Sequence, residues 1–302
     1  MKLFSKKNKS NGLINNGLIF YFTPSNGLGN TLIELAVLKS LFPKRLIIIV
    51  TNSKSLSILK GNFFVIKYKF TAIKRLIVFS VKQILLILSN LKLIGYILEN
   101  EDNNFQKFIK VRGGLLNFIA LIKYDCHFQI SKYINNISLP VDLDYCDKLI
   151  KNEFFKNEKI LDNLDNTCFI HIRRGDYLGF PNSEFPAVLE LNWYETAMEI
   201  MKRNYKIKKF IVCSDDPFYV KDIFGNLEDI AFFHKNVLTD FLIMSKCKYG
   251  ILSASSFSFC AAKISRDRYK SNQKFIAPKY WIGHRTRIWY PKEFKFKWIN
   301  YI

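Results

Sequence analysis

With 302 residues, of which 49% are apolar, the chain is long enough for two sizeable hydrophobic cores, and we expect two domains. Its 46 lysines and arginines exceed 25 acidic residues and leave a formal charge of +21, which points to anionic partners. Six cysteines without a Cys-x-x-Cys pair favour buried thiols in a reducing, cytoplasmic setting. The polar residues of 11–17 interrupt any secretory hydrophobic segment, so we expect no export signal.

The first half is predicted to be a parallel α/β unit, because short apolar runs alternate with helical patterns. We expect a strand over 18–23, a helix over 31–41 and a second strand over 46–51. The turn after the first strand, Asn26-Gly-Leu-Gly-Asn30, lacks the third glycine of the dinucleotide-binding fingerprint, since residue 32 is Leu32. The remaining functional interpretation is a turn that brings its backbone and Asn30 close to a ligand.

Positive charge is concentrated in the first third of the chain. Up to Lys123 there are 19 basic residues against four acidic ones, a local balance of +15. Residues 71–98 form a basic region with helical character, but its longest uncharged run, 83–91, is only nine residues. A membrane-spanning helix needs about 20 apolar residues. Two interpretations remain: domain helices with outward lysines, or a basic helix whose apolar face contacts an anionic leaflet.

The second half repeats the alternation of strands and helices. Residues 135–165 are polar and acid-rich without a clear period, and we expect them to connect two domains, 1–150 and 151–302. The expected strands are 167–172, 209–214, 229–233, 249–253 and 274–277, and the helices between them include 191–203, 239–247 and 257–264. This pattern predicts a doubly wound sheet, whose ligands bind outside the carboxyl ends of the strands.

Polar clusters follow three of these strands: 173–177, 215–217 and 253–258. In the first, Arg173 and Arg174 offer a fixed fork of donors suited to phosphate oxygens, and they keep their charge at any accessible pH. Gly175 allows the backbone to turn there. The alternative for such a pair is a solvated basic turn, but three strand ends at one edge favour a site for a nucleotide diphosphate.

The third cluster places serines where a strand ends and a helix is predicted to begin. Free amides at a helix N-terminus attract phosphate, and serine hydroxyls can add donors. Serine is also the usual residue that caps a helix start. Beside the arginine pair, the predicted phosphate-binding role of Ser255 and Ser256 is favoured over capping alone.

Six ordered motifs resemble those of the bacterial α-1,2-fucosyltransferases, glycosyltransferase family eleven. They are Asn26-Gly-Leu-Gly-Asn30, His171-Ile-Arg-Arg-Gly-Asp-Tyr177, Cys213-Ser-Asp-Asp216, Asp240-Phe-Leu-Ile-Met-Ser-Lys-Cys247, Ser255-Ser-Phe-Ser258 and Ile276-Ala-Pro-Lys279. Residues 53–125 match no motif. The resemblance implies a GT-B fold, in which two Rossmann-like doubly wound domains face a cleft. The N-terminal domain would take the acceptor and the C-terminal domain the GDP-sugar.

The same resemblance implies an inverting, metal-independent transfer of L-fucose from GDP-L-fucose to the 2-hydroxyl of a galactoside, without a cofactor. The acceptor would be a galactose-containing glycan or lipid-linked oligosaccharide of surface polysaccharide or O-antigen synthesis. The basic first third fits an enzyme that is peripheral on the inner membrane face. Thr31-Leu32 and Phe259-Cys260 depart from the family pattern, so another GDP-deoxysugar such as GDP-colitose remains an alternative donor.

The resemblance also implies roles for individual residues. Arg173 and Arg174 would hold the diphosphate, while His171 and Asp176 would shape that loop and contact the nucleotide. Asp240 would accept from guanine. The other expected substrate-binding residues are Asn26, Gly27, Gly29, Asn30, Ser214, Asp215, Ser255, Ser256 and Phe257. Asp176 and Asp215 are both candidates for the general base, and the motifs do not choose between them.

Other classes of function remain open at this point. Asp142-Leu-Asp144 has the spacing of a metal-bound diphosphate site, but short matches are frequent by chance. Charge alone would permit nucleic-acid binding, yet no recognisable binding module accompanies it, so we expect no nucleic-acid partner. A membrane-surface adaptor without enzymatic activity is a third alternative. His127, His234 and His284 lack ligand spacing and are interpreted as structural or acceptor-facing.

Overall fold

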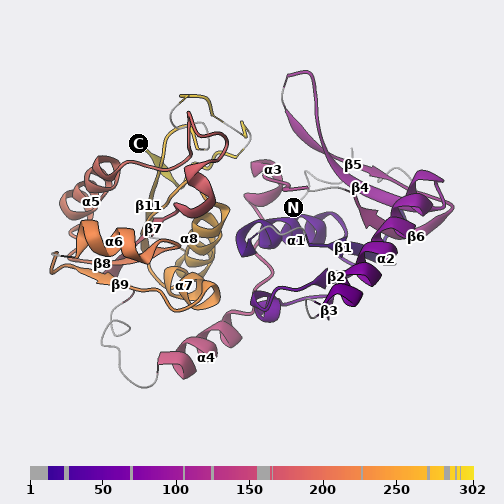
Figure 1. Ribbon diagram of the computed structural model, residues 1–302, viewed down its shortest axis with the longest axis horizontal. Helices are drawn as coiled ribbons and strands as arrows, with labels where there is room; N and C mark the ends of the chain where they lie inside the picture. The colour runs from indigo at the N-terminus through magenta and orange to yellow at the C-terminus, as the bar shows by residue number, and fades with distance from the viewer. Residues whose placement is uncertain are drawn as a thin grey trace. The chain divides into compact units, whose positions relative to one another are not determined.

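A computed structural model of the chain divides into two compact units, Met1–Val141 and Asp142–Ile302 (Figure 1). It describes residues 13–23, 27–68, 71–104, 106–123, 126–154, 164, 166–225, 227–270, 273–281, 286–289, 291–292 and 294–302. The division follows Val141, whereas the sequence suggests a boundary after residue 150. Helix α4 (Leu143–Phe154) belongs to the second unit because Asp147 on α4 pairs with Arg268 at 2.9 Å and with Lys246 at 3.3 Å.

The first unit is built around a mainly parallel sheet. Its elements are β1 (Leu18–Phe22), α1 (Leu28–Leu41), β2 (Leu46–Thr51), η1 (Ser55–Ile58), β3 (Phe63–Lys67), α2 (Ala72–Asn90), β4 (Ile94–Glu101), β5 (Lys107–Arg112), β6 (Leu116–Ile122) and α3 (Ser131–Ile134). Over the described residues the strand order is β3-β2-β1-β6-β4-β5, and only β4 and β5 run antiparallel. The strands predicted at 18–23 and 46–51 are confirmed, and the helix begins at Leu28, earlier than expected.

The second unit is a parallel doubly wound sheet, as the strand pattern predicts. Its elements after α4 are β7 (Thr167–Ile172), η3 (Gly175–Leu178), α5 (Leu191–Tyr205), β8 (Lys209–Ser214), α6 (Pro217–Phe224), β9 (Ile230–Phe232), α7 (Val237–Met244), β10 (Tyr249–Ile251), α8 (Ser256–Tyr269), β11 (Lys274–Ala277) and β12 (Asn300–Tyr301). The order among the described strands is β12-β11-β10-β7-β8-β9. All five predicted strands are present, so an α/β fold with two parallel-dominated sheets is confirmed. That the units face a cleft stays a prediction.

Two sequence expectations were wrong. The basic region 71–98 is not helical throughout, because α2 ends at Asn90 and Ile94 begins the strand β4. The connecting segment 135–165 is not without a period, because it contains the amphipathic helix α4, which buries Cys146 and Ile150 on one side. In α4, charged residues stand between the apolar ones, which makes the apolar stripe hard to recognise in the sequence.

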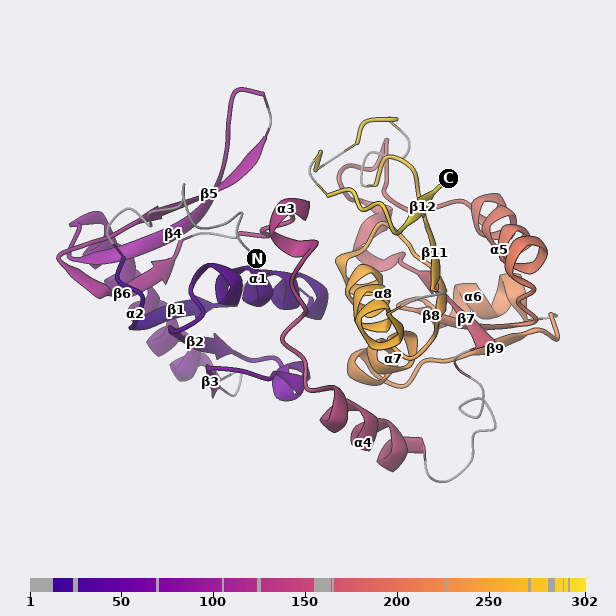
Figure 2. The ribbon, with the colours of Figure 1, turned by 180° about the vertical axis from the view of Figure 1, so that it is seen from behind.

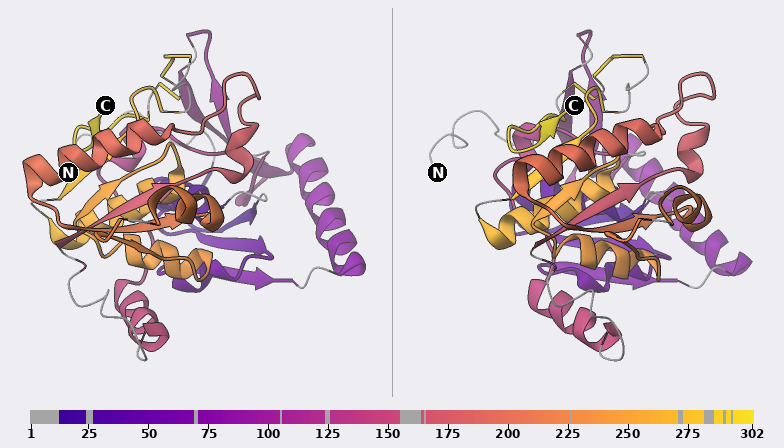
Figure 3. Two further views of the ribbon diagram at one scale, coloured as in Figure 1. Left: turned by 60° about the vertical axis from the view of Figure 1, so that its left-hand side comes forward. Right: turned by 90° about the vertical axis from the view of Figure 1, so that its left-hand side faces the viewer.

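The core of the second unit explains why its apolar runs form strands. One face of the sheet packs Ile170, Val212 and Ile251 against residues of α5 and α6, including Met198 and Phe224. On the opposite face α7 and α8 lie side by side (Figure 2). Helices therefore cover both faces of this sheet (Figure 3). Strands that are buried on both faces read as continuous apolar segments.

The cysteines behave as core residues. All six are free thiols and buried, and Cys168 and Cys213 lie within β7 and β8 as predicted. Burial raises the pKa of both thiols well above the ordinary value. They therefore stay protonated and act as small apolar side chains.

Each sheet has one point where the strand order reverses. In the first unit β1 leads to β2 and β3 on one side, while β6 lies on its other side. In the second unit β7 leads to β8 and β9, while β10 lies on its other side. Ligands of open α/β sheets bind outside the carboxyl ends of the strands at such points. The candidate ligand edges are therefore the ends of β1 and β6, and the ends of β7 and β10.

Candidate active site

The loop after β7 is joined to the end of β8 by an ion pair. Arg173 reaches Asp176 with Nη2 at 2.6 Å and Asp215 with Nη1 at 2.9 Å. Asp215 directly follows β8, so this guanidinium bridges the carboxyl ends of two neighbouring strands. The Arg173 side chain remains about a third exposed and can therefore meet a ligand from solvent.

Arg174 is less exposed than Arg173, and it contacts both a carboxylate and an aromatic ring. Its Nε lies 3.1 Å from Asp216 Oδ2, and its guanidinium carbon lies 3.5 Å from the centre of the Tyr219 ring. Its backbone N–H donates to Asp215 Oδ1 at 2.8 Å. Stacking on an aromatic face together with a carboxylate contact fixes the plane of a guanidinium. The predicted arginine pair is thus brought together with three carboxylates.

Gly175 leaves room for the Asp215 carboxylate beside the backbone. A Cβ atom at this position would lie 2.6 Å from Asp215 Oδ2, well inside van der Waals contact. The Asp215 carboxylate also receives the Arg174 N–H and Arg173 Nη1. A side chain at 175 would therefore displace the Asp215 carboxylate from these contacts.

The serine segment after β10 closes on the loop after β7. Ser253 Oγ lies 2.6 Å from His171 Nδ1, and the Tyr177 hydroxyl donates to the Ala254 carbonyl at 2.8 Å. Ser255 caps α8, since its Oγ accepts from the Phe257 N–H at 3.3 Å. The capping interpretation of Ser255 is confirmed. Helix α8 thus begins beside the point between β7 and β10 where the strand order reverses.

His171 lies inside the protein and not on its surface. Its ring is buried, packs 5.4 Å from the Phe257 ring centre and faces Ser253. Burial, with a smaller effect of the Arg173 charge, lowers the pKa of His171 to about 3. The imidazole is therefore neutral at pH 7, and it links the β7 strand to the serine segment and α8.

Asp240 lies in the first turn of α7, beyond the end of β9. It is almost fully buried, its Oδ1 accepts from the Lys235 N–H at 3.1 Å, and its Oδ2 lies 3.2 Å from His234 Nδ1. Burial raises the pKa of this carboxyl group above its usual value. The next residue, Phe241, packs 5.4 Å from the Phe257 ring centre, which ties α7 to the start of α8.

The remaining predicted residues of the second unit support these loops. Ser214 ends β8, and its Oγ accepts from the Asp216 N–H at 3.0 Å. Asp216 in turn caps α6 through Tyr219 N–H at 3.1 Å. Ser256 is the first residue of α8, and Phe257 is half-buried between His171 and Phe241.

The predicted residues of the glycine turn lie in the first unit. Gly27 is the N-terminal cap of α1, with Gly29 and Asn30 in the first turn, and a Cβ atom at Gly27 would meet nothing within 4 Å. Asn30 Oδ1 accepts from Gln129 Nε2 at 3.1 Å, which joins this turn to the segment after β6. Asn26 lies outside the described residues.

Sequence reasoning missed a buried acid beside that turn. Glu34 on α1 is fully buried, and its Oε2 accepts from the Tyr21 hydroxyl on β1. His127, after β6, places Nδ1 3.7 Å from Glu34 Oε1. Glu34 could have been singled out from the sequence, because it is the only acidic residue before Glu99.

Asp142 has a structural role at the start of α4. Its Oδ1 accepts from the Tyr145 N–H at 3.1 Å, and Asp144 lies in the first helical turn. Across the described ranges, no group of three or more His, Cys, Asp or Glu side chains is arranged to hold a metal ion. The Asp142-Leu-Asp144 spacing is thus accounted for by helix capping.

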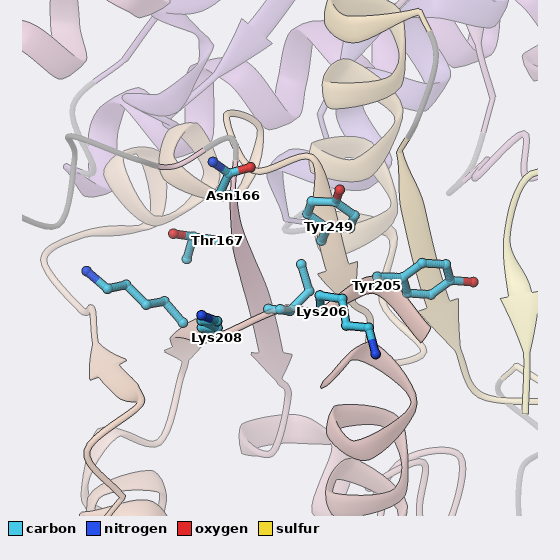
Figure 4. A pocket seen from close by; sticks show the side chains of 8 residues that line it. Asn166, Thr167, Tyr205, Lys206, Lys208 and Tyr249 are labelled. Carbon is cyan, nitrogen blue, oxygen red and sulfur yellow. The ribbon is translucent and has the colours of Figure 1, made fainter. Parts of the chain in front are cut away.

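A pocket of about 300 Å³ opens at the other edge of the second sheet (Figure 4). Asn166 and Thr167 line it at the beginning of β7, with Tyr249 at the beginning of β10. Lysines 206, 208 and 209 surround it. Because it lies at the amino ends of the strands, opposite the reversal-point loops, we place the candidate site at the carboxyl edge instead.

Comparison with curated proteins finds two relatives from Escherichia coli. A segment of 154 residues, covering 49% of this chain and 49% of the relative, is 28% identical to the O-antigen biosynthesis glycosyltransferase WbnK. A segment of 103 residues, covering 32% of this chain and 36% of the relative, is 31% identical to an alpha-1,2-colitosyltransferase. The chain thus spans about half the length of the first relative and about a third of the second.

Matches among solved structures include the fucosyltransferase NodZ from Bradyrhizobium, with 15% identity and a TM-score of 0.40 over 82% of this chain and 92% of that one. POFUT1 in complex with GDP shares 12% identity and a TM-score of 0.48 over 88% of this chain and 99% of that one.

The sequence model of glycosyl transferase family 11 matches residues 118–283, which is more than half of the chain. This region includes the arginine loop after β7, the carboxylates after β8 and the serine segment after β10. The resemblance carried by these motifs is confirmed: the chain belongs to glycosyl transferase family 11.

Proposed function

We propose that the protein transfers L-fucose from GDP-L-fucose to the 2-hydroxyl of a galactoside in surface polysaccharide or O-antigen synthesis, with inversion and without a metal ion. The observation that carries this proposal is the meeting of Arg173, Arg174 and the N-terminus of α8 at one reversal point of a parallel sheet. Family membership and the name of the relative WbnK support the reaction class and its pathway.

In this proposal the second unit binds the donor. Cleavage of the bond between sugar and diphosphate builds negative charge on the leaving phosphate, which prepositioned guanidinium groups stabilise more in the transition state than in the ground state. Arg173 and Arg174 supply that charge, and the amides at the start of α8, with Ser255 and Ser256, receive the phosphate oxygens. Asp240, oriented by His234, accepts from guanine.

The carboxylates around the arginines constrain how the diphosphate enters. The Asp176 side chain is 63% exposed, whereas that of Asp215 is 25% exposed, although both pair with Arg173. We therefore expect phosphate oxygens to displace Asp176 from Arg173, while Asp215 keeps the guanidinium in place. Both acids are engaged with a cation, which makes them poor candidates for the general base.

GDP-colitose is the alternative donor. It is favoured by one specific observation, the 31% identity to an alpha-1,2-colitosyltransferase over 103 residues. The two sugars differ by one hydroxyl group, and a site that hydrogen-bonds this hydroxyl discriminates strongly against a donor that lacks it.

A location at an anionic membrane surface is also proposed, on the basis of α2. Among the described residues no helix is both long and apolar enough to cross a bilayer. Yet α2 turns an apolar stripe outward, each member being more than half exposed: Ile73, Leu76, Ile77, Ile84, Ile87 and, just beyond the helix, Leu91. Helix α2 contains three basic and no acidic residues, which favours anionic lipid over another occupant.

The proposed reaction is tested by incubating the protein with a panel of GDP-sugars and galactose-terminated acceptors and reading the product linkage by NMR. We expect transfer from GDP-L-fucose and an α-1,2 linkage, with activity that survives a chelator. Faster transfer from GDP-colitose would select the alternative donor. Failure to bind or turn over any GDP-sugar would overturn the proposal.

The arginine pair is tested by Arg173→Ala, with Arg203→Ala as the matched control. Arg203 is 75% exposed on α5 and pairs with Glu199, away from the candidate site. Loss of a guanidinium that stabilises developing charge is expected to lower kcat by about 10²-fold or more, whereas Arg203→Ala should stay within about twofold of the wild type. Steady-state kinetics with GDP-L-fucose measure both, and equal activity of the two variants would contradict the role of Arg173.

A further inference from the structure

A histidine backed by a buried carboxylate lies at the ligand edge of the first unit. Glu34 is 1% exposed at its side chain, and its two oxygens face Tyr21 and His127. The His127 side chain is 37% exposed, so it reaches solvent while its carboxylate partner does not. Such a pair combines an accessible titratable ring with a fixed charge behind it.

The position of this pair follows from the sheet topology. Tyr21 lies in β1, Glu34 lies on the helix that follows β1, and His127 lies in the segment that follows β6. β1 and β6 are adjacent parallel strands, and the strand order reverses between them. Asn30 and Gln129 join the same two segments by a hydrogen bond of 3.1 Å. The pair therefore occupies the expected ligand crevice of this unit.

The backbone around His127 is held by a second acid. The N–H groups of His127 and Phe128 donate to Glu99 Oε2 on β4, the former at 3.2 Å. Glu99 Oε1 in turn pairs with Lys107 on β5 at 2.8 Å. The imidazole is thus fixed both through its ring and through its main chain, as a group that acts at a defined point requires.

We propose that His127, positioned by Glu34, is the general base that accepts the proton of the acceptor hydroxyl. This assignment rests on the proposed function, in which the first unit takes the acceptor. Asp176 and Asp215, the carboxylates that sequence alone suggests, are ion-paired with Arg173 and lie in the other unit.

In the proposed step the acceptor O–H bond breaks, and its proton moves to Nε2 of the neutral imidazole. The acceptor oxygen forms a bond to the anomeric carbon, and the bond from that carbon to the diphosphate oxygen breaks with its electron pair leaving on GDP. Glu34 then stabilises the imidazolium that His127 has become, as the buried acid does behind a catalytic histidine elsewhere.

The charges around His127 favour this role. The Glu34 carboxylate, 3.7 Å from Nδ1, is the largest influence on the pKa of His127 and raises it; Glu99 raises it further, burial and Lys107 lower it, and the net shift is upward. On the other side of Glu34, the Tyr21 hydroxyl donates a hydrogen bond to its Oε2. A base with a pKa near the working pH is the most effective in general-base catalysis.

The proposal is tested with His127→Gln and with Glu101→Gln as a control, an exposed residue at the end of β4. Removal of a general base is expected to lower kcat for transfer by about 10²- to 10⁴-fold. Binding of GDP, measured by calorimetry, should stay within about twofold, because donor contacts lie in the other unit. In the wild type kcat/KM should rise with pH through the pKa of His127, and this acidic limb should disappear in His127→Gln.

Two further measurements separate catalysis from structure. Free imidazole should restore transfer to His127→Ala by at least about tenfold, which a merely structural role would not allow. The His127 ring resonance, assigned by its absence from His127→Gln, should titrate above pH 6.5 in the wild type and lower in Glu34→Gln. This NMR titration needs no substrate, so it holds even where Glu34→Gln is inactive.

Failure of the proposed function and failure of the His127 assignment give different results. If wild-type protein binds and turns over no GDP-sugar, the proposed function fails and the role of His127 fails with it. If transfer is measurable but His127→Gln retains it within about twofold, or if imidazole restores nothing to His127→Ala, only the assignment of His127 is overturned. A ring that titrates below pH 6.5 would overturn the positioning role of Glu34.

Discussion

At the scale of single residues, the candidate site depends on side chains whose charge is set by their surroundings. The pKa of His171 is lowered by its surroundings, whereas that of His127 is raised. The first is buried against Ser253 and Phe257 and stays neutral, whereas the second faces a buried carboxylate and retains a proton more readily. The same residue type thus supports a loop in one unit and is proposed to move a proton in the other.

The burial of His171 predicts a loss of stability in acid. Its pKa is lowered from 6.5 to about 3 in the folded state, so as pH falls below 6.5 the unfolded chain binds a proton that the folded chain does not. The stabilisation is therefore fully present above pH 6.5 and is lost between pH 6.5 and about 3. At pH 5 the loss should be about 2 kcal/mol.

Urea unfolding of the wild type and of His171→Gln at pH 7 and pH 5 measures this effect. The wild type should lose about 2 kcal/mol more than the variant between the two pH values, because glutamine does not titrate. An identical pH dependence for both proteins would show that His171 is protonated or solvated in the folded state.

The sequence identified the residues of the arginine loop but not their partners. The loop contains three adjacent residues, Arg173, Arg174 and Gly175, directly after an apolar strand. Their chemical type and their position at a strand end can therefore be recognised from the local sequence. Their contacts with Asp215 and Asp216 join two strands that are separated by the helix α5. Such pairings depend on strand order, which a single sequence does not display.

At the scale of elements, prediction was most accurate for strands that are buried on both faces. β2, β7, β8 and β11 lie at the predicted residues, because a central parallel strand is a continuous apolar run with sharp polar ends. The strands within 94–122 were not predicted from the sequence, since β5 at the edge of the sheet mixes apolar and charged residues and β4 ends in the acidic segment Glu99–Glu101. The helix α6, only eight residues long, was also missed.

Arg45 holds together several elements of the first unit. It is buried, and its guanidinium donates to the carbonyls of Ile14 at 2.8 and 3.0 Å, of Leu18 at 3.2 Å and of Asn117 at 2.6 Å. These carbonyls belong to the segment before β1, to β1 itself and to β6. A planar fork of donors can reach them together, which a lysine ammonium cannot.

Arg45→Lys should therefore destabilise the first unit by about 2–4 kcal/mol, because buried carbonyls lose charge-assisted hydrogen bonds. Lys44→Ala, at the exposed neighbouring position, should change stability by less than about 0.5 kcal/mol. Hydrogen exchange of the β1 and β6 amides, read by mass spectrometry, should show faster opening in Arg45→Lys only. Unchanged protection of both strands would contradict the anchoring role.

At the scale of the whole molecule, the excess of positive charge and the exposed apolar stripe of α2 occur in the same unit. Up to Lys123 the chain carries a balance of +15, and α2 lies at the outside of its unit (Figure 3). Positive charge alone would favour binding to nucleic acid and binding to anionic lipid equally. Apolar side chains directed at solvent favour lipid, because their burial in a bilayer interface adds a gain that duplex DNA does not offer.

A location at the membrane predicts that vesicle binding depends both on the positive charge of the first unit and on the apolar stripe of α2. Wild-type protein should sediment with vesicles that contain anionic lipid and much less with zwitterionic ones, and binding should weaken as salt rises, since each basic residue near the surface contributes about 1 kcal/mol at low screening. Leu76→Gln combined with Ile84→Gln removes two apolar side chains from the stripe and should lower the partition coefficient at least about tenfold.

Leu227→Gln provides the matched control, since Leu227 is an exposed apolar residue of the second unit and should leave vesicle binding unchanged. GDP binding should be equal in all three proteins, because the altered helix lies outside the donor loops. If Leu76→Gln with Ile84→Gln binds vesicles as the wild type does but abolishes a concentration-dependent dimer in size-exclusion chromatography, the stripe is covered by a second copy of the chain and not by lipid.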